Sequence, residues 1–410
     1  MRSRRLVSAA TAGLAAAVLG AGPVWAAPVV PPLGTGQCLP APAGSSPDIP
    51  WPQRHLTPER AWALTEGAGV VVAVLDSGVD ARSPQLSGRV LPGIDLTRTG
   101  GGRADSDCLG HGTFVAGIIA AAPAAGTGVA GVAPKVQILP IRITDRPAGA
   151  PEAIATGIRT AVDRGADVVN VSAGTTVRDP AMEAAVRYAE QRNVVVVAAA
   201  GNRAEGPGVR TYPASLPGVL AVGAMNDSGR RSDSASAPVA LVAPGEDVVS
   251  IGPRGPGHWQ GSGTSYATPF VSGTAALVRA YRPGLSAAQI RHRLQATADL
   301  PAATLPDALL GWGVVNPMAA LATVLPEEGK AGAVAGEAQR AVAPDLRKTP
   351  EVGPFLAAGV ALVLLVAAGG AVLAVLGPAG HRRRWRPARV ADPYDPAPSP
   401  QEPEIAPPVR

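Results

Sequence analysis

Residues 70–79 read Val-Val-Val-Ala-Val-Leu-Asp-Ser-Gly-Val, an apolar run that ends in a carboxylate and a glycine. A short apolar run bounded by turn residues is typical of a strand that is buried on both faces. Five similar runs follow along the chain, at Val136–Ile141, Val168–Val171, Val194–Ala199, Leu220–Val222 and Val239–Val242. Helical patterns lie between several of them, at Glu152–Arg164 and Pro180–Gln191. Strands that alternate with helices predict an α/β fold with a parallel sheet covered on both faces.

The first candidate catalytic residue is Asp76, which closes the run that begins at Val70. Catalytic groups gather at the carboxyl ends of the strands in a parallel sheet. A carboxylate at this position can accept a hydrogen bond from an imidazole. An aspartate at the end of a strand is also a common helix cap, so this motif is weak alone.

The second motif covers residues 110–117, Gly-His-Gly-Thr-Phe-Val-Ala-Gly, in which His111 opens an apolar helix of small residues. The start of a helix exposes the imidazole ring, and the flanking glycines allow close backbone approach. A lone histidine is more often structural. The other four histidines have no such context and are interpreted as non-catalytic: His55, His258, His292 and His381.

The third motif covers residues 261–269, Gly-Ser-Gly-Thr-Ser-Tyr-Ala-Thr-Pro, and leads into an Ala-rich helix predicted to run to Tyr281. Ser265 then lies at the N-terminus of this helix, where the dipole and the free N–H groups favour negative charge. Its backbone N–H can also donate to a substrate oxyanion. The alternative is that Ser265 is a simple helix cap.

A fourth motif places Gly201 and Asn202 directly after the apolar run that begins at Val194. An asparagine amide at the end of a strand can donate a hydrogen bond to a developing oxyanion. Asn170 is the alternative donor, but its place inside Val168–Val171 favours a structural role.

The order Asp76, His111, Asn202 and Ser265, with these flanking sequences, resembles the subtilisin-like serine proteases (subtilases) over about residues 56–325. The resemblance implies a three-layer α/β/α fold around a mostly parallel sheet, and endopeptidase activity through an acyl-enzyme. Ser265 would attack the scissile carbonyl, His111 would transfer the proton, and Asp76 would orient the imidazole. Asn202 and the Ser265 N–H would form the oxyanion hole.

The same resemblance assigns the substrate contacts. Ser172, Ala173 and Gly174 would pair with an extended protein or peptide substrate as an added strand. Gly201 would line the first specificity pocket. No cofactor is implied.

A metal site is not expected. Asp105 and Asp107 are close in sequence, but they lack EF-hand-like spacing, and a solvated acidic loop is predicted instead.

The net charge of +5 does not indicate a nucleic-acid partner. Three arginines lie in residues 2–5, and residues 378–410 hold six arginines and four acids. Removing these nine bases and four acids from totals of 36 and 31 leaves 27 of each sign in residues 6–377. The globular part is therefore neutral, and nucleic-acid binding is not predicted.

The N-terminus is typical of an export signal. The three arginines precede the apolar stretch Leu6–Gly22, and Val24-Trp25-Ala26 fits a cleavage site, so residues 1–26 are predicted to be a signal peptide. The alternative is a transmembrane helix. Residues 27–55 form a Pro- and Gly-rich extension that is expected to lack regular structure.

A second apolar segment, Phe355–Leu376, runs 22 residues without a charge. At about 1.5 Å per residue it spans roughly 33 Å, which predicts a transmembrane helix at residues 354–377. The alternative is a buried core helix. Residues 326–353 form a polar linker before it, and five arginines follow it at once in the tail, residues 378–410. The positive-inside rule then places the tail in the cytoplasm and residues 56–325 outside the cell membrane.

Two cysteines, Cys38 and Cys108, remain after export. An even number of cysteines in an oxidising compartment favours a disulfide. This bridge would attach the N-terminal extension to the domain close to His111. The alternative is two free thiols.

The short extension with its cysteine, the C-terminal helix and the Arg-rich tail resemble those of mycosins, membrane-anchored subtilases associated with type VII secretion. This resemblance implies a partner, the type VII secretion membrane complex, with substrates among secretion-associated proteins. It also implies a role in stabilising that complex. A general scavenging protease and a purely structural subunit are the alternatives.

Overall fold

The computed structural model describes residues 30–328, except residues 31, 35–36, 43, 146–148, 202–208, 233–237 and 303. The predicted signal peptide, the transmembrane helix at residues 354–377, the tail and nearly all of the linker lie outside these residues, and they stay predictions. Among the described helices, none has both the length and the apolar character needed to cross a membrane.

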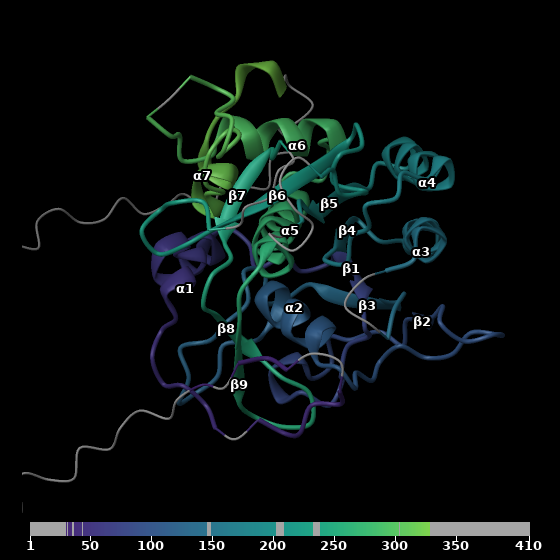
Figure 1. The fold of residues 1–410 in the computed structure, drawn as a ribbon. Coiled ribbons are helices and arrows are strands. Elements are labelled where there is room, and N and C mark those ends of the chain that lie inside the picture. Colours follow the sequence, from purple (N-terminus) through teal and green to yellow (C-terminus); the bar gives the residue numbers. More distant parts are fainter. Residues whose placement is uncertain are drawn as a thin grey trace, which may run out of the picture. The chain divides into compact units, whose positions relative to one another are not determined.

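A parallel sheet of seven strands forms the centre of the domain, in the order β2-β3-β1-β4-β5-β6-β7 (Figure 1). The strands are β1 Val71–Asp76, β2 Ile94–Asp95, β3 Gln137–Arg142, β4 Val168–Val171, β5 Val195–Ala199, β6 Val219–Met225 and β7 Leu241–Pro244. After β1, the chain forms β2 and β3 on one side of that strand, and it then forms β4 on the other side of β1. Ligands bind at such a switch point, outside the carboxyl ends of the strands, and Asp76 ends β1 there.

Helices cover both faces of the sheet, as Figure 1 shows. They are α2 His111–Ala120 and α5 Thr264–Tyr281 on one face, and α3 Pro151–Asp163 and α4 Pro180–Gln191 on the other. In β1, Val72 and Val74 join the core under α2 and α5. Ala73 and Leu75 join the core under α3 and α4. This alternation follows from the two-residue period of a strand, and it confirms the three-layer fold.

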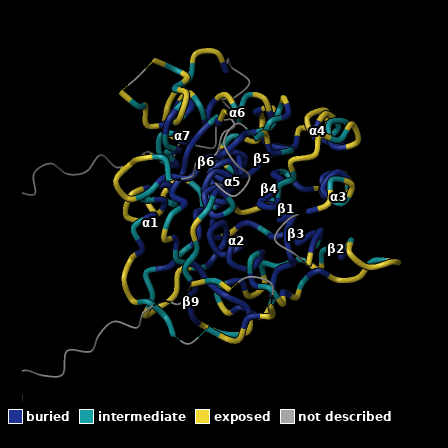
Figure 2. The backbone as a smooth tube through the Cα atoms, viewed as in Figure 1, coloured by how far each residue is buried: buried dark blue, intermediate teal, exposed yellow. Residues whose placement is uncertain are grey.

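The helix α5 is central to the domain and packs against five strands, β1 and β4 to β7. Fifteen of its 18 residues are buried, because the segment is apolar or small on every side. In contrast, α3 and α4 each bury one side and expose the other (Figure 2). The side chain of Asp179 caps α4 by accepting a 2.7 Å hydrogen bond from the Ala181 N–H.

An antiparallel hairpin leads directly into α5. It consists of β8 Val248–Ile251 and β9 His258–Gly261. The other helices in the described part of the chain are α1 Trp51–Leu56, α6 Ala287–Ala296, α7 Pro317–Ala322 and the short 3₁₀ helices η1 Pro58–Ala63, η2 Pro84–Leu86 and η4 Pro326–Glu328.

The helix α1 corrects the expectation that residues 27–55 lack regular structure. It begins at Trp51, directly after Pro50, and it buries Pro52 and Leu56. The indole N–H of Trp51 donates a 2.8 Å hydrogen bond to the Glu246 carbonyl. A proline in the first turn suits a helix, and the two buried apolar side chains attach it to the domain.

Candidate active site

Asp76 and His111 form the centre of the site. Asp76 lies at the carboxyl end of β1, and His111 is the first residue of α2. The His111 Nδ1 lies 2.8 and 2.9 Å from the two carboxylate oxygens of Asp76. The carboxylate is buried, whereas the His111 side chain keeps 28% of its surface exposed. Solvent therefore reaches part of the imidazole.

The glycines beside His111 allow this close approach of α2 to β1. A Cβ on Gly112 would lie 2.0 Å from the Gly78 carbonyl oxygen. Gly110 has a φ of 81°, a conformation that favours glycine. The packing agrees with the prediction that the glycines beside His111 allow close backbone approach.

The charge of Asp76 sets the protonation of His111. Burial acts to lower the pKa of His111, but the charge and hydrogen bond of Asp76 and the charge of Asp107 together raise it above the usual 6.5. The imidazolium is therefore stabilised in this position.

Ser265 lies in the first turn of α5, directly before Tyr266, whose ring packs on His111. The ring centroid of Tyr266 is 5.2 Å from that of His111 and 4.8 Å from that of Phe114. The structure thus brings the segment that carries Ser265 against the imidazole that Asp76 holds. The residue before Ser265 contacts the segment after β5: the Thr264 hydroxyl donates a 3.1 Å hydrogen bond to the Gly201 carbonyl.

Asn170 has the structural role that its place inside a strand favours. It is fully buried in β4. Its Nδ2 donates to the Ser172 Oγ at 2.9 Å, and its Oδ1 accepts from the Ser272 hydroxyl at 2.9 Å. Ser172 in turn donates to the Ser265 carbonyl at 2.9 Å. These bonds attach the first turns of α5, which carry Ser265, to β4 and to the residue that follows it.

The predicted substrate-binding segment follows β4 directly. Ser172 and Ala173 are buried and Gly174 is half-buried. The Ser172 hydroxyl faces α5, where it donates to the Ser265 carbonyl. The pairing of this segment with a substrate stays a prediction. Asn202 lies outside the described residues, whereas Gly201 is described two residues after the end of β5, with a φ of 95°.

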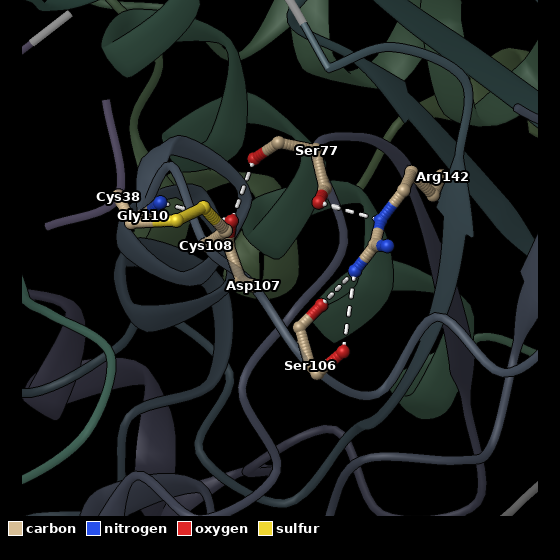
Figure 3. The surroundings of a disulfide bond; sticks show 7 residues. All are labelled: Cys38, Ser77, Ser106, Asp107, Cys108, Gly110 and Arg142. Carbon is tan, nitrogen blue, oxygen red and sulfur yellow. Dashed lines mark hydrogen bonds between the residues drawn. A yellow bond between two sulfur atoms is a disulfide. The ribbon is translucent and has the colours of Figure 1, made fainter. Parts of the chain in front are cut away.

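The prediction of a solvated acidic loop is wrong for Asp107. Asp105 is half-buried and pairs with Arg103. Asp107, however, is 3% exposed and accepts a hydrogen bond from the backbone N–H of Gly110 (Figure 3). It also accepts one from the backbone N–H of Thr113. It therefore satisfies N–H groups at the start of α2 that have no helical acceptor. An aspartate shortly before a predicted helix was the available signal.

The predicted disulfide between Cys38 and Cys108 is confirmed (Figure 3). The two Cα atoms lie 4.5 Å apart, and 70 residues separate them in sequence. The Leu39 N–H also donates to the Cys108 carbonyl at 2.8 Å, and Leu39 is buried. The N-terminal extension is thus fixed to the loop that precedes His111.

Two of the histidines interpreted as non-catalytic have other partners. His258 is buried in β9, and its Nδ1 accepts a 2.9 Å hydrogen bond from the Ser46 N–H. Burial lowers the pKa of His258 to about 4. His292 pairs with Glu327 at 2.8 Å on the surface, and His381 lies outside the described residues. Within the described part of the chain, no group of three or more acidic, cysteine or histidine side chains could hold a metal ion.

Comparison with known proteins agrees with this geometry. Residues 67–313 match the model of the Subtilase family, Peptidase_S8. Mycosin-4 of Mycobacterium tuberculosis (strain ATCC 25618 / H37Rv) is 38% identical over 386 residues, which cover 81% of each protein. Thermitase of Thermoactinomyces vulgaris is 38% identical over 251 residues, which cover 60% of this chain and 87% of thermitase.

Solved structures of related proteases share the fold. The MycP3 protease from the type VII (ESX-3) secretion system superposes with a TM-score of 0.60 at 32% identity, covering 71% of this chain and 94% of that protein. MycP1 with its N-terminal propeptide removed superposes with a TM-score of 0.58 at 33% identity, covering 68% of this chain and 98% of that protein. From the family match and these relatives, the chain belongs to the subtilase family of serine proteases, in which it is similar to the mycosins.

Proposed function

We propose that Asp76, His111 and Ser265 form the catalytic triad of a membrane-anchored serine endopeptidase. One observation carries this proposal: both Asp76 carboxylate oxygens lie within 2.9 Å of the His111 Nδ1. This contact orients the imidazole so that Nε2 is left for the Ser265 hydroxyl. The packing of Tyr266 on His111 supports the placement of Ser265 beside that nitrogen.

The reaction would proceed in two steps. The Ser265 oxygen attacks the scissile carbonyl carbon while the His111 Nε2 takes the hydroxyl proton. The carbon–nitrogen bond then breaks, and His111 gives its proton to the leaving amine. Water attacks the acyl-enzyme with His111 again as the base, which releases the new carboxyl terminus and restores Ser265. Asp76 stabilises the imidazolium that forms in each step.

The negative charge that develops on the substrate carbonyl oxygen must be stabilised by hydrogen-bond donors. The Ser265 N–H lies in the first turn of α5, where N–H groups have no helical acceptor and the dipole is positive. We assign the second donor to the Asn202 amide. Support comes from Gly201, the residue before it, whose carbonyl accepts a hydrogen bond from Thr264, the residue before Ser265.

The physiological substrates in this proposal are proteins linked to type VII secretion, and the partner is the secretion membrane complex. The similarity to Mycosin-4 and to a protease from a type VII secretion system supports this assignment. The disulfide between Cys38 and Cys108 fits an oxidising compartment outside the cytoplasm. The proposed location is the cell membrane, with one helix at residues 354–377 and the catalytic domain outside.

Cleavage of a peptide library by the full-length protein in detergent tests this function. Wild type should cleave a narrow set of peptides, and Ser265→Ala should cleave none. Ser262→Ala is the matched control, because Ser262 is an exposed serine three residues earlier. Cleavage by Ser265→Ala equal to wild type would refute the triad, and a broad profile would indicate a scavenging protease instead.

The role in secretion needs a cellular test. A strain that lacks the protein is complemented with wild type or with Ser265→Ala, and secretion through the type VII system is measured. If proteolysis is the function, only wild type restores processing of the secreted substrates. Equal processing by both would contradict a proteolytic role and leave a structural one.

A further inference from the structure

A buried chain of hydrogen bonds leads from Asp76 away from the proposed reaction centre. The Ser77 N–H donates to the Asp76 Oδ1 at 2.8 Å, and the Ser77 hydroxyl donates to the Asp107 Oδ1 at 3.0 Å. The Ser77 Oγ also accepts a 3.0 Å hydrogen bond from the Gly112 N–H, directly after His111. Ser77 thus connects the strand that carries Asp76 to the helix that carries His111.

Asp107 lies at the end of this chain and holds the start of α2. Its Oδ1 accepts from the Gly110 N–H at 2.9 Å, in addition to Ser77. Its Oδ2 accepts from the Thr113 N–H at 2.9 Å and from the Thr113 hydroxyl at 2.7 Å. One carboxylate therefore fixes the residues on both sides of His111.

Four donors converge on the Asp107 carboxylate. An ionised carboxylate accepts all four, whereas a protonated carboxyl turns one acceptor site into a donor. Burial, and to a smaller extent the charge of Asp76, raise the pKa of Asp107 to about 6, although the hydrogen bonds from Thr113 and Gly110 act to lower it. A neutral serine or asparagine would cap a helix without burying a charge. Helix capping alone therefore does not require the charge of Asp107.

The loop that carries Asp107 has separate anchors on both sides (Figure 3). Arg142 on β3 donates to the Ser106 carbonyl and, at 3.3 Å, to the Ser106 hydroxyl. On the other side, Cys108 is bonded to Cys38. The loop is therefore held without the Asp107 side chain, which leaves that side chain free to act on α2.

We propose that Asp107 is a positioning residue, whose ionised carboxylate holds His111 in register with Asp76 through Ser77 and the first turn of α2. The inference rests on the proposed triad. The charged groups around it are Asp76 on β1, His111 on α2 and Arg142 on β3, which donates a 3.0 Å hydrogen bond to the Ser77 carbonyl. Asp105 on the same loop is paired with Arg103.

The test compares Asp107→Asn with Asp105→Asn in the full-length protein. Asparagine keeps the shape, but its amide turns one oxygen into a donor that faces the donors of α2. The rate of labelling by a fluorophosphonate probe is measured against probe concentration and pH. Asp107→Asn should lower the limiting rate roughly 10²-fold, as expected for a displaced catalytic group, with the apparent KI unchanged. Asp105→Asn should label like wild type.

The pH profile separates positioning from a general loss of structure. The negative charge of Asp107 raises the pKa of His111. Its removal should therefore lower that pKa and move the acid limb of the labelling rate to lower pH. A limiting rate and an acid midpoint equal to those of wild type would overturn the proposal.

Two further measurements keep the outcome decisive. If Asp107→Asn does not fold, Ser77→Ala removes the middle link, and a labelling loss of less than about tenfold would contradict the proposal. If wild type itself is not labelled, the proposed triad fails. In that case the NMR titration of His111 in wild type and Asp107→Asn still tests positioning, since an unshifted pKa would refute it.

Discussion

The Ser172 hydroxyl donates a 2.9 Å hydrogen bond to the Ser265 carbonyl. In a regular helix this carbonyl would accept from the N–H four residues later, but that residue is Pro269, which has none. Ser172, directly after β4, supplies the missing donor. The relationship explains two small features of the sequence together, the proline inside α5 and the serine at the end of a buried strand.

Removing this donor should destabilise the domain. Ser172→Ala leaves the Ser265 carbonyl without this donor in a half-buried position, and the free energy of unfolding should fall by about 1–3 kcal/mol. Urea unfolding followed by tryptophan fluorescence measures the change, with Ser262→Ala as an exposed control. An unchanged midpoint for Ser172→Ala would show that another donor satisfies the carbonyl.

The activity should be lost on the acid side of neutrality. His111 acts as a base only when it is neutral, and Asp76 and Asp107 raise its pKa above 6.5 despite burial. The labelling rate should therefore fall as the pH decreases, with a midpoint above 6.5. A midpoint below this value would show that burial, and not the carboxylates, sets the protonation of His111.

The assignment of Asn202 as an oxyanion donor predicts a partial loss. Asn202→Ala should lower the cleavage rate roughly 10²–10³-fold, the effect of removing one such donor in subtilisin, a member of the same family. Ser265→Ala should abolish cleavage, because it removes the nucleophile. Peptide cleavage by purified variants measures both. Equal rates for wild type and Asn202→Ala would overturn the assignment.

The disulfide should make a large contribution to stability. It closes a loop of 70 residues, and the loss of chain entropy in the unfolded state corresponds to about 4 kcal/mol. The double variant Cys38→Ser/Cys108→Ser should unfold at a lower urea concentration than wild type under oxidising conditions. Dithiothreitol should lower the midpoint of wild type and leave that of the variant unchanged. A midpoint that dithiothreitol does not move would contradict this contribution.

Much of the fold could be predicted because its signals are local. Apolar runs identified the strands β1 and β3 to β7, and α4 has the predicted bounds Pro180–Gln191. The strand β2 has two residues, too few for a pattern, and β9 reads His-Trp-Gln-Gly, which alternates poorly. The helix α1 was not predicted, because Pro50 and Pro52 are typical of irregular segments and also suit the start of a helix.

The site was predicted less completely, because its supporting contacts join distant parts of the chain. Asp76 and His111 stand in recognisable motifs, and the structure places them in contact. The bond from Ser172 to Ser265 crosses 93 residues, and no local pattern shows it. The sequence indicates a solvated acid at Asp107, because the burial of this side chain depends on contacts with β1 and α2 that no local pattern shows.

The central claim is that Ser265 is the nucleophile of an assembled triad. The most direct measurement is to label the full-length protein with a fluorophosphonate probe and to map the modified residue by mass spectrometry. We expect one modification, on Ser265 in wild type, and none in Ser265→Ala. A folded wild type that stays unlabelled, or a label on another serine, would contradict it.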